Sequence, residues 1–198
     1  IAATLVLDSG FFSAIALMMG KMGHVWLAAH QVAINYATVV FMIPVSISSA
    51  TMARVGQAIG QEIPVLARTR GFLGLSCSVA LVIPSILLIL IAPQWIAGIY
   101  SADVAVVQAA IPLLFVVAFL QLFDATYITA QGALRGLKDV NGPLLISFSF
   151  WFVGLPTAWW LGIEMGQGAV GLWWGMVVGI AVTAVLLVWR LHWRSART

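Results

Sequence analysis

The chain has 198 residues, of which 63% are hydrophobic and only 8% are charged, and its mean hydropathy is +1.09. A soluble domain of this length would have more apolar surface than one compact core could bury. The composition therefore excludes a soluble globular domain and indicates a membrane protein. The net charge of +3 does not indicate nucleic acid as a partner, because the basic residues are dispersed between apolar segments.

Six long apolar segments follow one another, over residues 1–20, 30–53, 72–92, 104–131, 143–162 and 168–190. Each is long enough to cross about 30 Å of hydrocarbon as a helix. The sequence thus predicts an all-α integral membrane protein with six transmembrane helices in one bundle. The longest break, residues 56–71, has room for a short interfacial helix.

The first segment does not suit a signal peptide. The chain starts at Ile1 without a basic leader, and Asp8 stands in the middle of the segment, where a signal-peptide core would tolerate it poorly. We therefore expect this chain to be part of a longer protein whose upstream portion is missing here.

Basic residues alternate along the chain in a way that predicts orientation. Eight of the nine lie after the second, fourth and sixth segments, and the other loops carry only Lys21. Positive charge is retained on the cytoplasmic side of membranes, so these regions and the C-terminus are expected to be cytoplasmic in a multi-pass protein of the cell (inner or plasma) membrane. The segment ends are also expected to hold interfacial tryptophans, namely Trp26, Trp95, Trp159, Trp160, Trp173, Trp174, Trp189 and Trp193.

Two acids lie inside apolar segments, Asp124 in the fourth and Asp8 in the first. A carboxylate in hydrocarbon costs several kcal/mol even on lenient scales, so such a residue faces protein or a water-filled cavity and marks an ion or substrate pathway. No Lys or Arg lies inside any segment to neutralise either acid. Function is therefore favoured over a structural role for Asp124 and Asp8.

Polar residues also recur at helical spacing within three segments. In the fourth segment they are Gln121, Asp124 and Gln131, with Tyr127 on the flank, and Asp8 shares a face of the first segment with Thr4. The alternative to a cavity lining is hydrogen bonding between helices, which Ser, Thr, Asn and Gln commonly provide. One face of the second segment carries Gln31, Asn35, Thr38, Met42, Ser46 and Ser49.

Several separated motifs resemble one transporter family. They are AAHQVAINY at 28–36, FMIPVSI at 41–47, ARVGQAIG at 53–60, AQGALRG at 130–136, GLPT at 154–157 and GLWWG at 171–175. This pattern, which spans essentially the whole chain, resembles the multidrug and toxic compound extrusion (MATE) family in its NorM-like branch. The resemblance implies helices seven to twelve of a twelve-helix, two-lobe transporter, with the N-terminal lobe of the same protein as a partner.

The resemblance also implies an activity, which is export of organic, often cationic, compounds driven by inward flow of Na⁺ or H⁺ through alternating access. Asp124 matches the family's helix-ten aspartate, and Asp8 stands where a glutamate is usual in helix seven; these are cation-binding residues in the family. Leu120 replaces a tyrosine that some members carry. No cofactor, and no metal beyond Na⁺ at Asp8 and Asp124, is expected.

Cavity-lining or substrate-contacting candidates are the polar and aromatic residues near these acids. A carboxylate pair can take a proton or a hard cation, with neutral oxygens from Gln121 or Asn35. Aromatic faces such as those of Tyr36, Phe123 or Tyr127 suit a lipophilic cation. The full set of candidates is Gln31, Asn35, Tyr36, Thr38, Gln121 and Tyr127.

Two other function classes stay open. Asp8 and Asp124 could form the acid–base pair of an intramembrane aspartyl enzyme, although the sequence before Asp124 lacks the Gly-x-Gly of such proteases and we expect no enzyme. A flippase for lipid-linked sugars shares the architecture, but it usually places arginines inside its cavity, whereas Arg54 and Arg135 lie at segment ends.

Overall fold

The computed structural model describes the backbone of residues 2–196 and the side chains of residues 10–196. The described chain is almost entirely helical. The helices are α1 (Ala2–Lys21), α2 (His24–Gly60), α3 (Pro64–Ile91), α4 (Pro93–Tyr100), α5 (Val104–Gly136), a continuous run of α6 (Asn141–Ser149), η1 (Phe150–Gly154), α7 (Leu155–Trp159) and η2 (Trp160–Glu164), and finally α8 (Gly168–Ser195).

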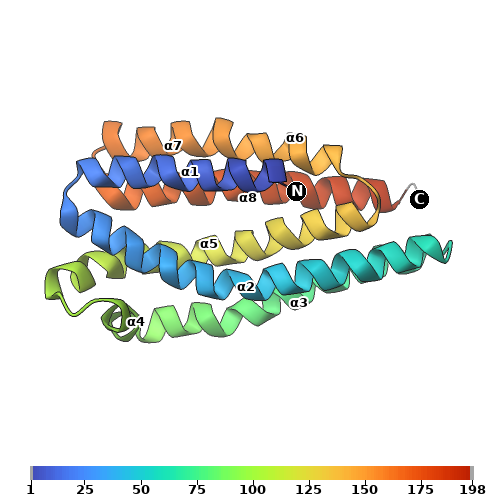
Figure 1. Cartoon of the computed structure of the whole chain (residues 1–198), viewed down its shortest axis with the longest axis horizontal. Coiled ribbons are helices and arrows are strands. Elements are labelled where there is room, and N and C mark those ends of the chain that lie inside the picture. Colours follow the sequence, from blue (N-terminus) through green and yellow to red (C-terminus); the bar gives the residue numbers. More distant parts are fainter. Residues whose placement is uncertain (1, 197–198) are drawn as a thin grey trace.

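The long helices form one elongated bundle with α5 at its centre (Figure 1). In this view α2 and α3 lie on one side of α5, and α1, α6–α7 and α8 lie on the other, while the packing of α5 is mainly against α2, α8 and α3. Because α5 contacts helices on both sides, its opposite faces meet different surroundings.

The prediction of an all-α membrane protein is confirmed. Five helices are long and apolar enough to cross a membrane, namely α2, α3, α5, the run Asn141–Glu164 and α8. The described side chains of α1 form a shorter apolar stretch, Gly10–Lys21. Together these elements give six antiparallel passes along the bundle (Figure 1).

The short interfacial helix considered for residues 56–71 is not formed. The α2 helix continues to Gly60 and α3 begins at Pro64, so only a tight turn separates them. Polar residues there extend both helices beyond the apolar core, and proline at the first helical position suits the start of α3. A short helix occurs elsewhere, as α4, which also begins with a proline, Pro93.

The helix Asn141–Glu164 is interrupted by two π-helical segments. The first, Phe150–Gly154, directly precedes Pro156 in the following turn. Proline removes a backbone donor and clashes with the preceding turn, and a π-type widening is one way for a helix to continue through that position.

Small residues allow α2 and α5 to pack closely. A Cβ placed on Gly132 would overlap Ser48, and one on Gly136 would lie 2.7 Å from the carbonyl oxygen of Met52. The Ser48 hydroxyl donates to the carbonyl oxygen of Ile128 over 2.7 Å. This is the small-residue packing, supplemented by interhelical hydrogen bonds, that is usual between membrane helices.

The three basic regions of the described chain lie at one end of the bundle, where α2, α5 and α8 finish and α3 begins (Figure 1). Lys21 lies at the other end, near the start of α2. The alternation seen in the sequence is therefore a real segregation of charge between the two ends.

One tryptophan prediction is wrong. Trp95, Trp159, Trp160, Trp189 and Trp193 are exposed, as interfacial anchors should be, but Trp173 is fully buried. Its indole lies edge-on to His30, with 5.5 Å between ring centroids. Residue position near a helix end fixes depth along the bundle but not which face the residue occupies, and Trp173 faces the interior.

Candidate functional site

A cavity of about 400 Å³ opens beside the middle of α5 and contains Asp124. Leu120, Asp124 and Tyr127 supply the α5 wall, because their spacing of four and three residues places them on one helical face. The other walls come from four elements, through Phe12 of α1, Ile34, Ala37, Thr38 and Phe41 of α2, Phe150 of η1, and Ile180 and Thr183 of α8.

The surroundings of Asp124 in this cavity are mostly apolar. Besides the carboxylate, the polar lining groups are the hydroxyls of Thr38, Tyr127 and Thr183. Thr38 donates to the carbonyl oxygen of Ile34 over 2.8 Å, and Thr183 donates to that of Gly179 over the same distance. Their oxygens keep acceptor capacity, so the cavity offers a half-buried carboxylate and hydroxyl oxygens to a cation or a proton.

The polar stripe predicted on α2 lies along one exposed face. Gln31, Asn35, Thr38, Met42, Ser46 and Ser49 are all exposed in this chain. The Gln31 amide nitrogen donates to Asn35 Oδ1 over 3.0 Å, and Ser46 and Ser49 donate to carbonyl oxygens one turn earlier. These side chains thus bond within their own helix, and Thr38 joins the stripe to the cavity.

Bonds between helices are made by other residues. Ser78 donates to the Ala125 carbonyl oxygen over 3.4 Å, and the hydroxyls of Ser149 and Thr183 lie 2.9 Å apart. The interhelical role weighed for the α2 stripe therefore belongs largely to serines that the sequence pattern did not single out.

Gln121 lies one turn from Asp124 and lines a small hollow that adjoins it, together with Pro44 of α2 and Val82 of α3. Its side chain is 4% exposed, and neither Oε1 nor Nε2 has a hydrogen-bond partner among the described residues. A buried carboxamide without partners is unfavourable, so Gln121 Oε1 and Nε2 keep their full hydrogen-bonding capacity for a group other than the described residues.

The aromatic candidates are divided among three places. Tyr127 lines the cavity of Asp124. Tyr36 is buried against α3, where its hydroxyl lies 2.7 Å from Ser85 Oγ. Phe123 lines a separate groove on the other side of α5.

Asp8 belongs to α1, but its side chain lies outside the described residues, so its distance from Asp124 is not given by the structure. Leu120 is 1% exposed and contributes an apolar surface to the cavity. Among the described residues there is no group of three or more His, Cys, Asp or Glu side chains that could hold a metal ion.

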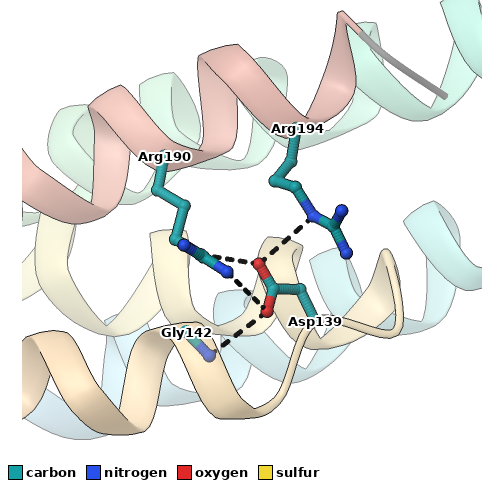
Figure 2. A network of polar contacts seen from close by, with 4 residues as sticks. All are labelled: Asp139, Gly142, Arg190 and Arg194. Atoms are coloured by element: carbon teal, nitrogen blue, oxygen red, sulfur yellow. Dashed lines mark hydrogen bonds and ion pairs between the residues drawn. The ribbon is translucent and has the colours of Figure 1, made fainter.

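A second buried carboxylate, Asp139, lies in the loop between α5 and α6. Its oxygens accept bonds from Arg190 Nε over 2.7 Å and Arg190 Nη2 over 3.1 Å, and Arg194 Nε lies 3.5 Å away (Figure 2). The Gly142 N–H adds a bond of 3.2 Å. A side chain on Gly142 would overlap the Arg190 guanidinium, so glycine permits this approach.

Burial by itself would raise the pKa of Asp139, but the hydrogen bonds from Arg190 and Gly142 and the charges of Arg190 and Arg194 hold that pKa below its ordinary value. The network fastens the α5–α6 loop to the end of α8. The sequence placed Asp139 only in a polar break, because its arginine partners lie more than fifty residues further along the chain.

Comparison with known proteins gives the family. A family model described as MatE matches residues 1–160. Over 202 residues the chain is 42% identical to the multidrug resistance protein NorM of Burkholderia vietnamiensis, covering 99% of this chain and 44% of the relative. It is 36% identical to a probable multidrug resistance protein NorM of Pseudomonas syringae pv. tomato, covering 100% of this chain and 44% of the relative.

The fold agrees with this relationship. The crystal structure of a eukaryotic MATE transporter, AtDTX14, superposes with a TM-score of 0.89 at 21% identity, covering 99% of this chain and 46% of that one. The chain thus spans less than half the length of the relatives it matches. It belongs to the MATE family, as the C-terminal six-helix half of a twelve-helix, two-lobe transporter fold.

Proposed function

We propose that the full-length protein exports organic, often cationic, compounds across the cell membrane in exchange for Na⁺ or H⁺. The names of the relatives support multidrug efflux, and the family consists of transporters and not enzymes. The aspartyl-enzyme alternative is thereby removed. Asp124 in its apolar cavity is the observation that carries the coupling role.

The physical basis is the unfavourable energy of a charged carboxylate in a largely apolar cavity. Binding of a proton or a small hard cation neutralises Asp124, and release restores the charge. Asp8 would share this role, and neutral oxygens such as Gln121 Oε1 would complete the ligands of a metal cation. The transporter alternates between an inward-open and an outward-open state. Ion binding can shift the balance between these two states only if the ion binds one of them more tightly, and by no more than that difference in binding free energy.

The N-terminal lobe of the same protein would cover the side of this lobe on which the polar face of α2 is exposed. The exposed polar face of α2, which reaches the cavity through Thr38, would then face a central passage between the lobes. The concentration of basic residues at the end containing the α8 terminus supports a cytoplasmic C-terminus.

A lipid-linked-sugar flippase is less well supported. Such a substrate carries phosphate groups, and the residues lining the cavity include no basic side chain. The cavity therefore suits a positively charged ligand better than a negatively charged one.

Asp124→Asn in the full-length protein, reconstituted in vesicles, tests the coupling role. We expect efflux driven by a Na⁺ or H⁺ gradient to fall to background, because asparagine keeps the shape but cannot change its charge. The matched control is Asp103→Asn. Asp103 caps α5 by accepting a bond from the Ala105 N–H over 2.8 Å, and asparagine caps a helix equally well. Gradient-driven efflux that survives unchanged in Asp124→Asn would show that the role assigned to Asp124 is wrong.

A further inference from the structure

A groove of about 620 Å³ runs along the outer side of α5, between the start of α3 and the last turns of α8. Its α5 wall is made by Leu122, Phe123 and Thr126. At about 100° per residue, Leu122 and Thr126 lie roughly 160° from Asp124 around α5, and Phe123 lies roughly 100° from it. The groove is therefore separate from the cavity and from the polar face of α2.

The wall of this groove suits hydrocarbon. Val185 and Trp189 of α8 line it and are 64% and 67% exposed. The hydroxyl of Thr126 donates to the carbonyl oxygen of Leu122 over 3.0 Å, so its proton is already used within α5. Exposed apolar surface of this kind between membrane-spanning helices favours an apolar guest over water.

One end of the groove is polar. His192, in the last turn of α8, lines the groove, and its Nδ1 lies 3.3 Å from Arg68 Nη2 of α3. A guanidinium can only donate, so Nδ1 accepts and the imidazole carries its proton on Nε2, a second donor. Arg68 makes no ion pair with a carboxylate of the described chain, where Asp139 is the acid of the ion pairs found.

The dimensions agree with one lipid chain. From Ala184 to His192, the α8 residues of the groove span roughly 12 Å at the usual helical rise. Half of the hydrocarbon core is roughly 15 Å deep. The apolar part on α8, from Ala184 to Trp189, spans roughly 8 Å at that rise and so covers about half of one leaflet. Arg68, near the start of α3, and His192, in the last turn of α8, lie beyond it toward the end of the bundle where the basic residues gather.

We propose that this groove binds an anionic phospholipid, with one acyl chain along Phe123, Val185 and Trp189 and the phosphate held by Arg68 and His192. Guanidinium groups match phosphate oxygens in geometry and charge. The site does not depend on the transport mechanism, since it lies on the opposite side of α5 from Asp124.

Native mass spectrometry of the full-length protein in detergent tests the site, using phosphatidylglycerol and phosphatidylcholine with identical acyl chains. We expect the first phosphatidylglycerol to bind about five-fold more tightly than phosphatidylcholine. Arg68→Gln should abolish this preference and leave phosphatidylcholine binding unchanged. Val185→Trp, at an exposed position that should not affect folding, should weaken the binding of both lipids because the larger side chain fills the groove.

The control variants separate a site from general attraction. Arg54→Gln removes an exposed basic residue of α2 at the same end, and Val178→Trp changes an exposed valine of α8 outside the groove; both should bind lipid as the unmodified protein does. The proposal would be overturned if Arg54→Gln and Arg68→Gln reduced the preference for phosphatidylglycerol equally. It would also be overturned if Val185→Trp bound both lipids as tightly as the unmodified protein does. Competition by glycerophosphoglycerol, which has the headgroup without chains, at the same concentration as the lipid would also overturn it.

Discussion

Asp124 and Asp139 are both carboxylates in a very hydrophobic chain, but the structure gives them opposite surroundings. Asp139 is 5% exposed and lies within hydrogen-bond or ion-pair distance of two guanidinium groups. Asp124 is half-buried and lines a cavity whose other walls are apolar or carry hydroxyls. The Asp139 charge lies between two guanidinium groups, whereas Asp124 lines a space that a mobile ion can enter.

This difference separates structure from function. A carboxylate neutralised by arginines stays charged through a transport cycle and can hold helices together. A carboxylate in an apolar cavity changes its state when a proton or cation arrives. Figure 2 shows why the first is structural, since Asp139 joins a loop to the final helix through Arg190 and Arg194. Three tests follow, from the largest expected effect to the smallest.

Asp139→Asn should destabilise the protein more than Asp124→Asn. Removing one partner of a fully buried ion pair costs about 3–5 kcal/mol, but Arg190 and Arg194 are 31% and 42% exposed and can be solvated. We therefore expect a loss of about 2 kcal/mol in the free energy of unfolding. Chemical unfolding of the full-length protein in detergent measures this loss.

The companion measurement is efflux per folded molecule in vesicles. Asp139→Asn should keep it near the unmodified level, whereas Asp124→Asn should change stability by less than about 1 kcal/mol while stopping gradient-driven efflux. The comparison fails if the two variants lose stability equally or if Asp139→Asn alone abolishes efflux from correctly folded protein.

The same two residues show what the sequence could and could not reveal. Asp124 was found because a charge within a long apolar run is unusual wherever its partners lie. Asp139 was missed as a buried residue because it lies in a polar loop, and its burial depends on Arg190, 51 residues away. Contacts over such separations have no signal in local composition.

The helices show a similar limit. Hydropathy located all six passes, because each must cover the hydrocarbon thickness. It did not reveal α4, which is only eight residues long, or the π-helical segment Phe150–Gly154, whose widening depends on hydrogen-bond geometry rather than residue type. The burial of Trp173 was missed for a related reason, since depth in the membrane does not fix which way a helix face points.

Acid should weaken the Asp139 network. The pKa of Asp139 in the folded protein is held below its ordinary value of 3.8 by Arg190, Gly142 and Arg194. A lowered folded-state pKa stabilises the protein above the unfolded-state value, and this contribution is lost as the pH falls through the folded-state value. The thermal unfolding midpoint of the unmodified protein should therefore fall more steeply below pH 3.8 than that of Asp139→Asn. Parallel curves for the two proteins would contradict the lowered pKa.

Two buried glutamines of α5 extend the comparison to neutral groups. Gln131 is 1% exposed, donates to Ser147 Oγ over 3.3 Å and accepts from Arg135 Nη2 over 2.6 Å. Gln121 is similarly buried, but its carboxamide has no hydrogen-bond partner among the described residues. Burial is thus matched, while hydrogen bonding differs.

Replacing each glutamine with leucine should separate a structural carboxamide from a ligand. Gln131→Leu removes the hydrogen bonds that Gln131 makes to Ser147 and Arg135 and should cost about 1–2 kcal/mol of unfolding free energy. Gln121→Leu removes a polar group that has no partner among the described residues, so stability should stay constant or rise by up to about 1 kcal/mol. If Gln121 Oε1 serves the coupling ion beside Asp124, Gln121→Leu should nevertheless raise the Na⁺ or H⁺ concentration needed for half-maximal efflux. A different outcome would be that Gln121→Leu lowers the unfolding free energy as much as Gln131→Leu does and leaves the ion concentration for half-maximal efflux unchanged. That result would assign Gln121 a structural contact, because losing a protein partner weakens folding without weakening ion binding.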